Sequence, residues 1–300
     1  MALHKMQKPV STVLAPFDEN LAPQQRLESC LELSALASKV ATFIIAHTIV
    51  DYSELLQDER LSVASSFLQR VTSTHLCNHK LTKEGIEYRY RGEVFHLHEE
   101  FKTMTLTRSV YEHLAMFYFL YVHPKSDEER TVVWDYWKIN SRKNLLDLTP
   151  DDEIETLRRE IFDTRLGKWC HAKLDEWTAF DKPTQNGSIE FFKSRGRTDV
   201  RRLAYSQAWK YLFEKQDMAQ LYRHLSMHCH PVYNGLLQYQ SQAVSDEGND
   251  GIPLYLSSCF LAYLCRLFLR LIPDGRQLLA REFSQQERAV FNAMAQLPDE

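Results

Sequence analysis

Apolar residues recur at three- and four-residue spacing along most of the chain, which is the period of an amphipathic helix. Glycine and proline, which interrupt helices, are scarce, with nine glycines and ten prolines among 300 residues. The pattern therefore predicts an all-α fold, a multi-helix bundle of mostly antiparallel helices. The predicted helices cover residues 22–50, 51–74, 99–122, 126–146, 151–177, 198–214, 217–229, 253–272 and 284–296.

One segment has the two-residue period of a β-strand instead. From Gly85 to His98, GIEYRYRGEVFHLH, apolar and polar residues alternate on both sides of Arg91-Gly92, which predicts a small β-hairpin on the helical core. Loops are expected before residue 190 and at 244–253, where Gly, Pro, Asp and Asn gather. We expect a single helical domain over residues 1–300, with a core at about 22–240 and C-terminal helices at about 253–297.

The segment from Ile252 to Ile272 is almost continuously apolar and has the length of a membrane span. It contains Arg266 and Arg270, which share one helix face because they are four residues apart. Arginine inside a bilayer is costly, so we interpret the segment as a buried helix with one polar edge. No membrane association is expected.

Composition narrows the class of protein only slightly. A hydrophobic content of 44% suffices for a full core, and a formal net charge of −4 gives no global attraction to nucleic acid. Binding of a polyanion would therefore need a local basic patch. The stretch FFKSRGRTDVRR, residues 191–202, is the candidate because it joins aromatic rings to five cationic side chains. These are Lys193, Arg195, Arg197, Arg201 and Arg202. The alternative is the solvated start of a helix.

The cysteines and the N-terminus indicate the expected compartment. The six cysteines are scattered without a disulfide framework, and the N-terminal sequence has no apolar run typical of a signal peptide. We therefore expect a reduced, cytoplasmic protein. No glycine-rich phosphate loop, GxSxG elbow or paired CxxC is present, so no cofactor is expected.

The stretch LYRHLSMHCHPVYNG, residues 221–235, has the highest density of chemically useful side chains. On a helix, its apolar stripe has two polar borders. One border carries Tyr222, Arg223 and Ser226, and the other carries His224 and His228.

Pro231 disfavours helical geometry at His230, so the helix is predicted to end there with His230 in the exit turn. A second helix, within 99–122, carries Arg108 and Glu112 on a face that is otherwise apolar. A helix that is apolar all round is buried, and a buried charge requires a partner. We expect Arg108 and Glu112 to form a pair, either as a structural salt bridge or as part of a polar centre between the two helices.

These residues together resemble a mainly bacterial family of helical proteins, a domain of unknown function, over about residues 25–240. The residues that carry the resemblance are Tyr222, Ser226, His230 and Pro231, with Arg108 and Glu112 on the other helix. That family is distantly similar to the HEPN superfamily, whose signature is an arginine, four to six residues, and a histidine. The permitted spacing is met by Arg223 with His228 or with His230, and by Arg108 with His113.

The HEPN resemblance implies a metal-independent endoribonuclease of phage-defence or toxin systems, with RNA as its substrate and a site formed across a homodimer. His230 or His228 would transfer protons, because histidine titrates near neutral pH. Arg223 and Arg108 would hold the phosphate, and Glu112 would orient an arginine. Supporting hydrogen bonds would come from Tyr222 and Ser226.

Competing interpretations remain open. His224 and His228 have the i,i+4 spacing of two metal ligands, and further ligands could come from Glu99, Glu100 or His171. We nevertheless expect no metal. The cluster HLCNH, residues 75–79, is interpreted as surface polar residues, and Cys229 as a small apolar residue rather than a nucleophile. The alternative function is a non-catalytic helical module that binds a partner protein in a bacterial defence or regulatory complex.

Overall fold

A computed structural model describes residues 8–97, 100–124 and 251–296, single positions between 126 and 138, and residues 225 and 226. The chain divides into two compact units, residues 1–114 with 219–300, and residues 115–218. Most of the second unit lies outside the described residues, as do the helices expected at 151–177 and 198–214. The single domain over residues 1–300 stays a prediction.

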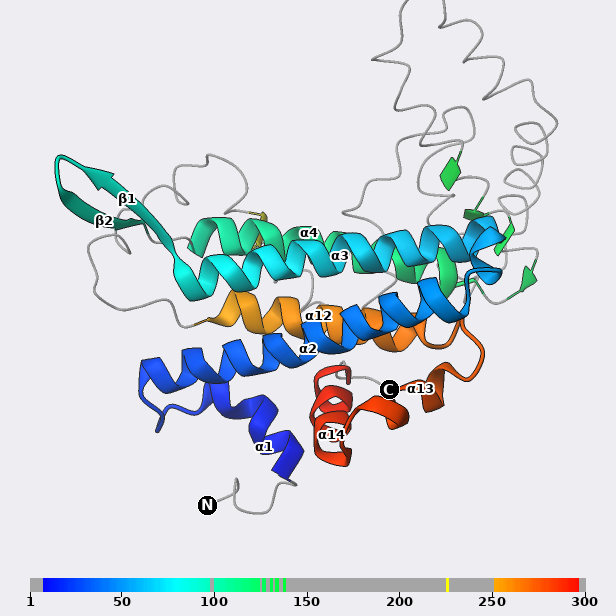
Figure 1. The fold of residues 1–300 in the computed structure, drawn as a ribbon, viewed down its shortest axis with the longest axis horizontal. Helices are drawn as coiled ribbons and strands as arrows, with labels where there is room; N and C mark the ends of the chain where they lie inside the picture. Colours follow the sequence, from blue (N-terminus) through cyan, green and yellow to red (C-terminus); the bar gives the residue numbers. More distant parts are fainter. Residues whose placement is uncertain are drawn as a thin grey trace, which may run out of the picture. The chain divides into compact units, whose positions relative to one another are not determined.

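The first unit is built almost entirely of helices, so the predicted helical class is confirmed for the described residues (Figure 1). Two short 3-10 turns, η2 (Ala15–Phe17) and η3 (Leu55–Gln57), connect its longer elements. The helices of this unit are α1 (Lys8–Leu14), α2 (Pro23–Asp51), α3 (Glu59–Glu84), most of α4 (Glu100–Tyr121), α12 (Ile252–Phe268), α13 (Gly275–Glu282) and α14 (Gln285–Met294).

One predicted helix was placed wrongly. The helix expected at 51–74 begins at Glu59, because Asp58 caps it: the Asp58 carboxylate accepts a hydrogen bond from Leu61 N at 2.9 Å. It then continues to Glu84 and ends at Gly85, whose φ of 63° is accessible to glycine. This extension carries the HLCNH cluster into the helix.

Two short strands follow α3. β1 (Ile86–Tyr90) pairs antiparallel with β2 (Glu93–Leu97), and Tyr90 lies opposite Glu93. The two residues between them, Arg91 and Gly92, have φ values of 54° and 86°. Two successive positive φ values are typical of the tight turns whose twist matches that of the flanking strands.

α12 is the central helix of the first unit. It buries all of its residues except Ile252, Leu256 and Arg266, which agrees with the interpretation of this segment as a core helix. α2 and α12 run parallel: Cys30, near the start of α2, lies beside Gly251, and Tyr52, at the end of α2, donates a hydrogen bond to the carbonyl of Pro273 at 2.9 Å (Figure 1).

Among the described helices, only α2 is long and apolar enough to cross a membrane by length and composition. The same test is passed by core helices of soluble proteins. The buried residues of α2, such as Leu33, Ala37 and Ile44, recur every three or four positions as in a helix packed along one side. The absence of membrane association and the cytoplasmic location stay predictions.

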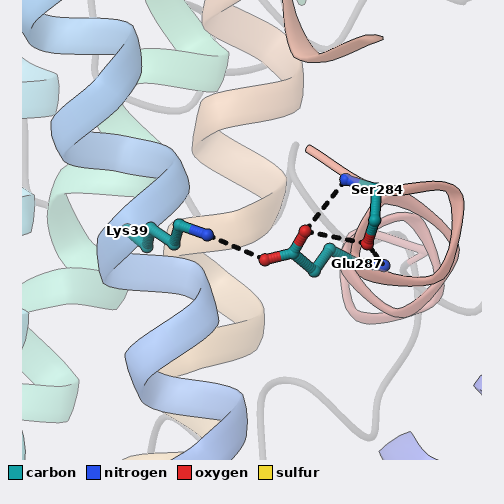
Figure 2. Close-up of polar contacts among 3 residues, drawn as sticks. All are labelled: Lys39, Ser284 and Glu287. Atoms are coloured by element: carbon teal, nitrogen blue, oxygen red, sulfur yellow. Dashed lines mark hydrogen bonds and ion pairs between the residues drawn. The ribbon is translucent and has the colours of Figure 1, made fainter. Parts of the chain in front are cut away.

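An exposed ion pair links α14 to α2 (Figure 2). Lys39 Nζ donates to Glu287 Oε1 at 2.8 Å, while Glu287 Oε2 accepts from the backbone N of Ser284 at 2.9 Å. Ser284 Oγ in turn accepts from the backbone N of Glu287, so the two residues cap the first turn reciprocally. The pKa of Glu287 is lowered to about 2, mainly by the hydrogen bond from Lys39 and next by the hydrogen bonds from Ser284. The first turn of α14 is therefore capped where it meets α2.

The second unit, where it is described, contains a chain of aromatic rings. The ring centroids of Phe117 and Tyr121 lie 4.6 Å apart, those of Tyr121 and Trp134 6.0 Å apart, and those of Trp134 and Trp137 5.5 Å apart. Aromatic pairs at such distances pack favourably. The end of α4 therefore packs against the 133–138 segment within this unit.

We predict that Gly251→Ala destabilises the protein more than Gly92→Ala does. Both glycines have positive φ, so alanine is strained by roughly 1 to 2 kcal/mol at either position. A Cβ at Gly251 would also lie 2.9 Å from the Cβ and Sγ of Cys30, whereas a Cβ at Gly92 would meet nothing within 4 Å. Urea unfolding of both variants measures the difference. Equal losses of unfolding free energy would contradict the close contact between α2 and the start of α12.

Candidate functional site

Arg108 and Glu112 form an ion pair on α4. Arg108 Nε donates to Glu112 Oε1 at 2.9 Å, and the two side chains are 18% and 23% exposed. Their four-residue separation places both side chains on the same helix face, so the pair forms between residues that are close in the sequence. The expected pair is confirmed.

The residues around this pair on α4 are buried or half-buried. No residue between Leu106 and Pro124 is exposed, and Leu114 and Phe117 have no exposed surface. This agrees with the expectation that the helix becomes apolar all round. A charged pair in such a setting is only partly hydrated, so its charges interact more strongly than they would in bulk water.

The pair faces away from α3. Two contacts between described residues link α4 to α3: Thr107 accepts a hydrogen bond from Asn78, and the His113 ring lies 6.1 Å from that of Phe67. Because successive helical residues are rotated by about 100°, Arg108 and Glu112 lie about 100° or more around the helix from both contacts. The ion pair is therefore on the opposite side of α4 from α3.

The same geometry separates Arg108 from His113, although their spacing fits the arginine–histidine signature. The two residues are rotated by about 140° from each other on one continuous helix. His113 Nδ1 donates to the carbonyl of Ser109 at 2.7 Å, and burial lowers the pKa of His113. The structure therefore does not bring Arg108 and His113 together as one site.

Of the predicted 217–229 helix, only Leu225 and Ser226 are described, and both are helical. Leu225 has no exposed surface and Ser226 is half-buried, as expected for a residue of the apolar stripe and one at its border. The other predicted site residues of this helix lie outside the described residues, namely Tyr222, Arg223, His228 and His230.

Several other predicted residues also lie outside the described part of the chain. They include the basic stretch, with Lys193, Arg195, Arg197, Arg201 and Arg202, and the alternatives His171, His224 and Cys229. Among the described residues, no group of three His, Cys, Asp or Glu side chains could hold a metal ion. The expectation of no metal stays a prediction for the whole chain.

The interpretation of HLCNH as surface residues was wrong for two of its members. His75 and Asn78 have no exposed surface, and His79 is half-buried, whereas Cys77 is exposed. The reason is that α3 continues to Glu84, so its buried stripe passes through positions 71, 75, 78 and 82. The three- and four-residue spacing of these positions indicated burial, but the residues at 75, 78 and 82 are polar, so the pattern was not interpreted as a buried stripe.

His75 connects three helices. Its Nε2 is hydrogen-bonded to Ser34 Oγ on α2 at 2.9 Å, and its Nδ1 to Ser257 Oγ on α12 at 2.7 Å. A neutral imidazole has one donor and one acceptor nitrogen, so one hydroxyl donates to the ring and the other accepts from it. Ser34 Oγ is also hydrogen-bonded to His79 Nδ1 at 2.9 Å.

A second chain of hydrogen bonds links α3, α4 and α12. Asn78 Nδ2 donates to Thr107 Oγ1 at 3.0 Å, and Thr107 Oγ1 donates to the carbonyl of Pro253 at 2.8 Å. All three residues are buried. We refer to the five buried side chains of both chains of hydrogen bonds as the polar layer, and they are Ser34, His75, Asn78, Thr107 and Ser257.

The polar layer is uncharged. Burial lowers the pKa of His75 from 6.5 to about 4, so the ring is neutral at pH 7. Since none of the five side chains reaches solvent, the layer has no access for a substrate. Its role in the described structure is to join helices, and the Arg108–Glu112 pair is the described part of the candidate site.

No protein-family model, curated protein or solved structure matches this chain.

We predict that stability falls between pH 6.5 and pH 4 because of His75. Its folded pKa is below the unfolded value, so the unfolded chain takes up a proton first, and the stability present above pH 6.5 is lost as the pH falls towards 4. The total loss is up to about 3 kcal/mol. Urea unfolding of the wild type and of His75→Gln across this range measures it, since glutamine keeps a donor and an acceptor but does not titrate. A variant curve with the same slope as the wild type would contradict a neutral, buried His75.

Proposed function

We propose that the chain is a HEPN-like RNA-processing protein, a metal-independent endoribonuclease of phage-defence or toxin type. The observation that supports it is the half-buried Arg108–Glu112 pair on the side of α4 that faces away from α3. An arginine oriented by a carboxylate is suited to holding a phosphate group, because its planar fork matches two phosphate oxygens. Arg108 and Glu112 are also two of the residues that carry the resemblance to HEPN-like proteins.

The proposed chemistry needs no metal. A base removes the proton of an RNA 2′-hydroxyl, the 2′-oxygen attacks the adjacent phosphorus, and the bond to the 5′-oxygen breaks as an acid protonates that oxygen. His230 or His228 would be the base or the acid. Arg223 and Arg108 would stabilise the negative charge that develops on the phosphate.

The remaining residues have supporting roles in this proposal. Glu112 holds the Arg108 guanidinium through Nε, and Tyr222 and Ser226 supply hydrogen bonds. His113 is not part of the proposed site, because it lies on another side of α4. A homodimer would complete the site, and a partner protein of a defence system would control it.

The double variant Arg108→Gln with Glu112→Gln should abolish RNA cleavage and leave the melting temperature nearly unchanged. The two amides can keep a hydrogen bond across the same turn, so neither residue is left unpaired, but the positive charge at the phosphate is lost. We expect cleavage to fall about 100-fold or more, as when one charge-stabilising donor is removed from an active site. The assay uses diverse RNAs in excess chelator, with bacterial lysate added to supply a trigger.

Two controls accompany this variant. Arg130 forms an exposed ion pair with Asp127 at 2.7 Å, so Arg130→Gln removes a comparable but solvated pair and should leave cleavage intact. His113→Gln should do the same. If all variants cleave like the wild type, or if only His113→Gln loses activity, the Arg108–Glu112 site is wrong.

A non-catalytic interaction module is the second candidate function. It is favoured by apolar side chains exposed at the end of α2 and just beyond it: Ile49 is 48% exposed, Val50 73% and Leu55 38%. Exposed apolar side chains that form a contiguous patch are typical of surfaces that bind a partner. The interaction module replaces the ribonuclease as the proposed function if the wild-type protein cleaves none of the RNAs and the double glutamine variant still folds.

A further inference from the structure

Four hydrogen-bonding side chains connect the half-buried side of α3 with the interior. His79 Nδ1 lies 2.9 Å from Ser34 Oγ, which also lies 2.9 Å from His75 Nε2. The other ring nitrogen of His75, Nδ1, lies 2.7 Å from Ser257 Oγ. Of the four side chains, only that of His79 is half-buried, and the other three are buried. We refer to them as the relay, because they lead from a partly exposed histidine on α3, through α2, to a buried serine of α12.

The single hydroxyl proton of Ser34 couples the two histidines. Ser34 Oγ can donate to one ring nitrogen only, so the other nitrogen must carry a proton and donate to Ser34. If both nitrogens carried protons, the buried hydroxyl would have no acceptor among the described residues. If neither carried a proton, one of the two contacts would join two lone pairs. The tautomers of His75 and His79 are therefore set together.

Two arrangements of protons satisfy this condition. In the first, Ser257 donates to His75 Nδ1, and His75 Nε2 donates to Ser34. Ser34 then donates to His79 Nδ1, and the Nε2 proton of His79 lies on the half-buried side. In the second arrangement, every donor and acceptor of the relay is exchanged. Only the first uses the hydroxyl proton of Ser257, which has no other acceptor among the described residues, so the first is favoured while His79 is neutral.

A proton added to His79 excludes the first arrangement. A protonated imidazole carries a proton on both nitrogens, so His79 Nδ1 can then only donate, and Ser34 must donate to His75. We propose that protonation of His79 reverses the relay and transfers the proton of the buried His75 from Nε2 to Nδ1. The relay would thereby carry a pH signal from the side of α3 to its contact with α12. This inference does not depend on the proposed ribonuclease activity.

The reversal takes up one proton from solvent in total. His79 gains that proton and becomes a cation, whereas His75 stays neutral and both serines keep their hydroxyl protons. His75 loses the proton on Nε2 and gains one on Nδ1, an exchange with water that occurs during local opening of the helices. The reversed relay leaves the hydroxyl proton of Ser257 without an acceptor among the described residues, so the contact between α3 and α12 is weaker in that state.

Neighbouring groups on α3 determine the pH of the reversal. Burial is the main cause that lowers the pKa of His79, Lys83 lowers it further, and Glu84 raises it. The reversal is therefore expected below pH 6.5. The pKa of His75 is lowered to about 4, mainly by burial, and a proton on His79 lowers it further. His75 is therefore neutral when His79 takes up its proton.

The other helices around the relay supply no second group that titrates near neutral pH. On α2, Cys30 and Arg26 lie one and two turns before Ser34. On α12, the only charged residue is in the last turn, and burial raises the pKa values of Tyr255 and Cys259. On α4, the residue that contacts α3 beside the relay is a threonine. Thiols, phenols and guanidinium groups keep their charge state between about pH 7 and pH 5, so His79 is the group that responds.

Nitrogen NMR of the full chain, labelled with nitrogen-15 in its histidine rings, tests the proposal because protonated and unprotonated ring nitrogens have different chemical shifts. We expect the proton of His75 on Nε2 at pH 7.5 and on Nδ1 once His79 is protonated. Both changes should follow one titration curve with a midpoint below pH 6.5. The proposal is overturned if His75 keeps one tautomer while His79 titrates, or if its proton is already on Nδ1 at pH 7.5.

Two matched variants test the coupling. Lys83→Gln and Glu84→Gln change exposed side chains that act on His79 in opposite directions. The first should shift the midpoint of both histidines to higher pH, and the second should shift it to lower pH. His113→Gln removes another half-buried histidine outside the relay and should leave the midpoint unchanged. A variant that shifts the midpoint of His79 but not that of the His75 tautomer would overturn the coupling.

Removal of the titrating group gives the last test. His79→Gln keeps a hydrogen-bond donor and an acceptor beside Ser34 but cannot be protonated, so His75 should keep one tautomer from pH 7.5 to pH 5. Thermal melting shows whether this variant remains folded over that range. A His75 tautomer that still changes at the wild-type midpoint in the folded variant would show that His79 does not control it.

Discussion

A neutral histidine with no exposed surface joins α3 to α2 and α12 and constrains the register of these three helices. His75 must find two hydrogen-bond partners in the interior, because a buried polar group without them costs free energy. Its partners come from two other helices, Ser34 on α2 and Ser257 on α12. A shift of any of these helices by one turn would separate the hydrogen-bonded partners. The contact therefore fixes the register of the helices more specifically than apolar packing does.

The fixed register extends to α4. Asn78, one turn beyond His75, binds Thr107, and Thr107 binds the carbonyl of Pro253 at the start of α12. These contacts determine which side of α4 faces the neighbouring helices. Arg108 and Glu112 lie on the other side as a consequence, half-buried rather than enclosed. The uncharged groups thus join helices in the interior, and the charged groups occupy positions where some solvent reaches them.

The sequence predicted those features that depend on residues close together in the chain. The Arg108–Glu112 pair is one helical turn apart, and α12 is recognisable from its continuous apolar run. The polar layer could not be predicted in this way. The partners of His75 are 41 and 182 residues away, so its burial is decided by tertiary contacts that a local pattern does not contain. A pocket lined by Arg266, Arg276 and Asn292 could not be predicted for the same reason, since these residues come together only when α13 and α14 fold back onto α12.

The buried polar layer joins helices, whereas the Arg108–Glu112 pair is proposed to bind RNA phosphate. The most direct measurement is an NMR titration of protein labelled in its arginine and histidine side chains with a 2′-O-methyl RNA, which can bind but cannot be cleaved. We expect a saturable shift of the Arg108 Nε–H signal, with the His75 ring signals unchanged and typical of a neutral imidazole. An Arg108 signal that does not move while other signals show that the RNA is bound would contradict the proposed site, and a His75 ring protonated at pH 7 would contradict the uncharged polar layer.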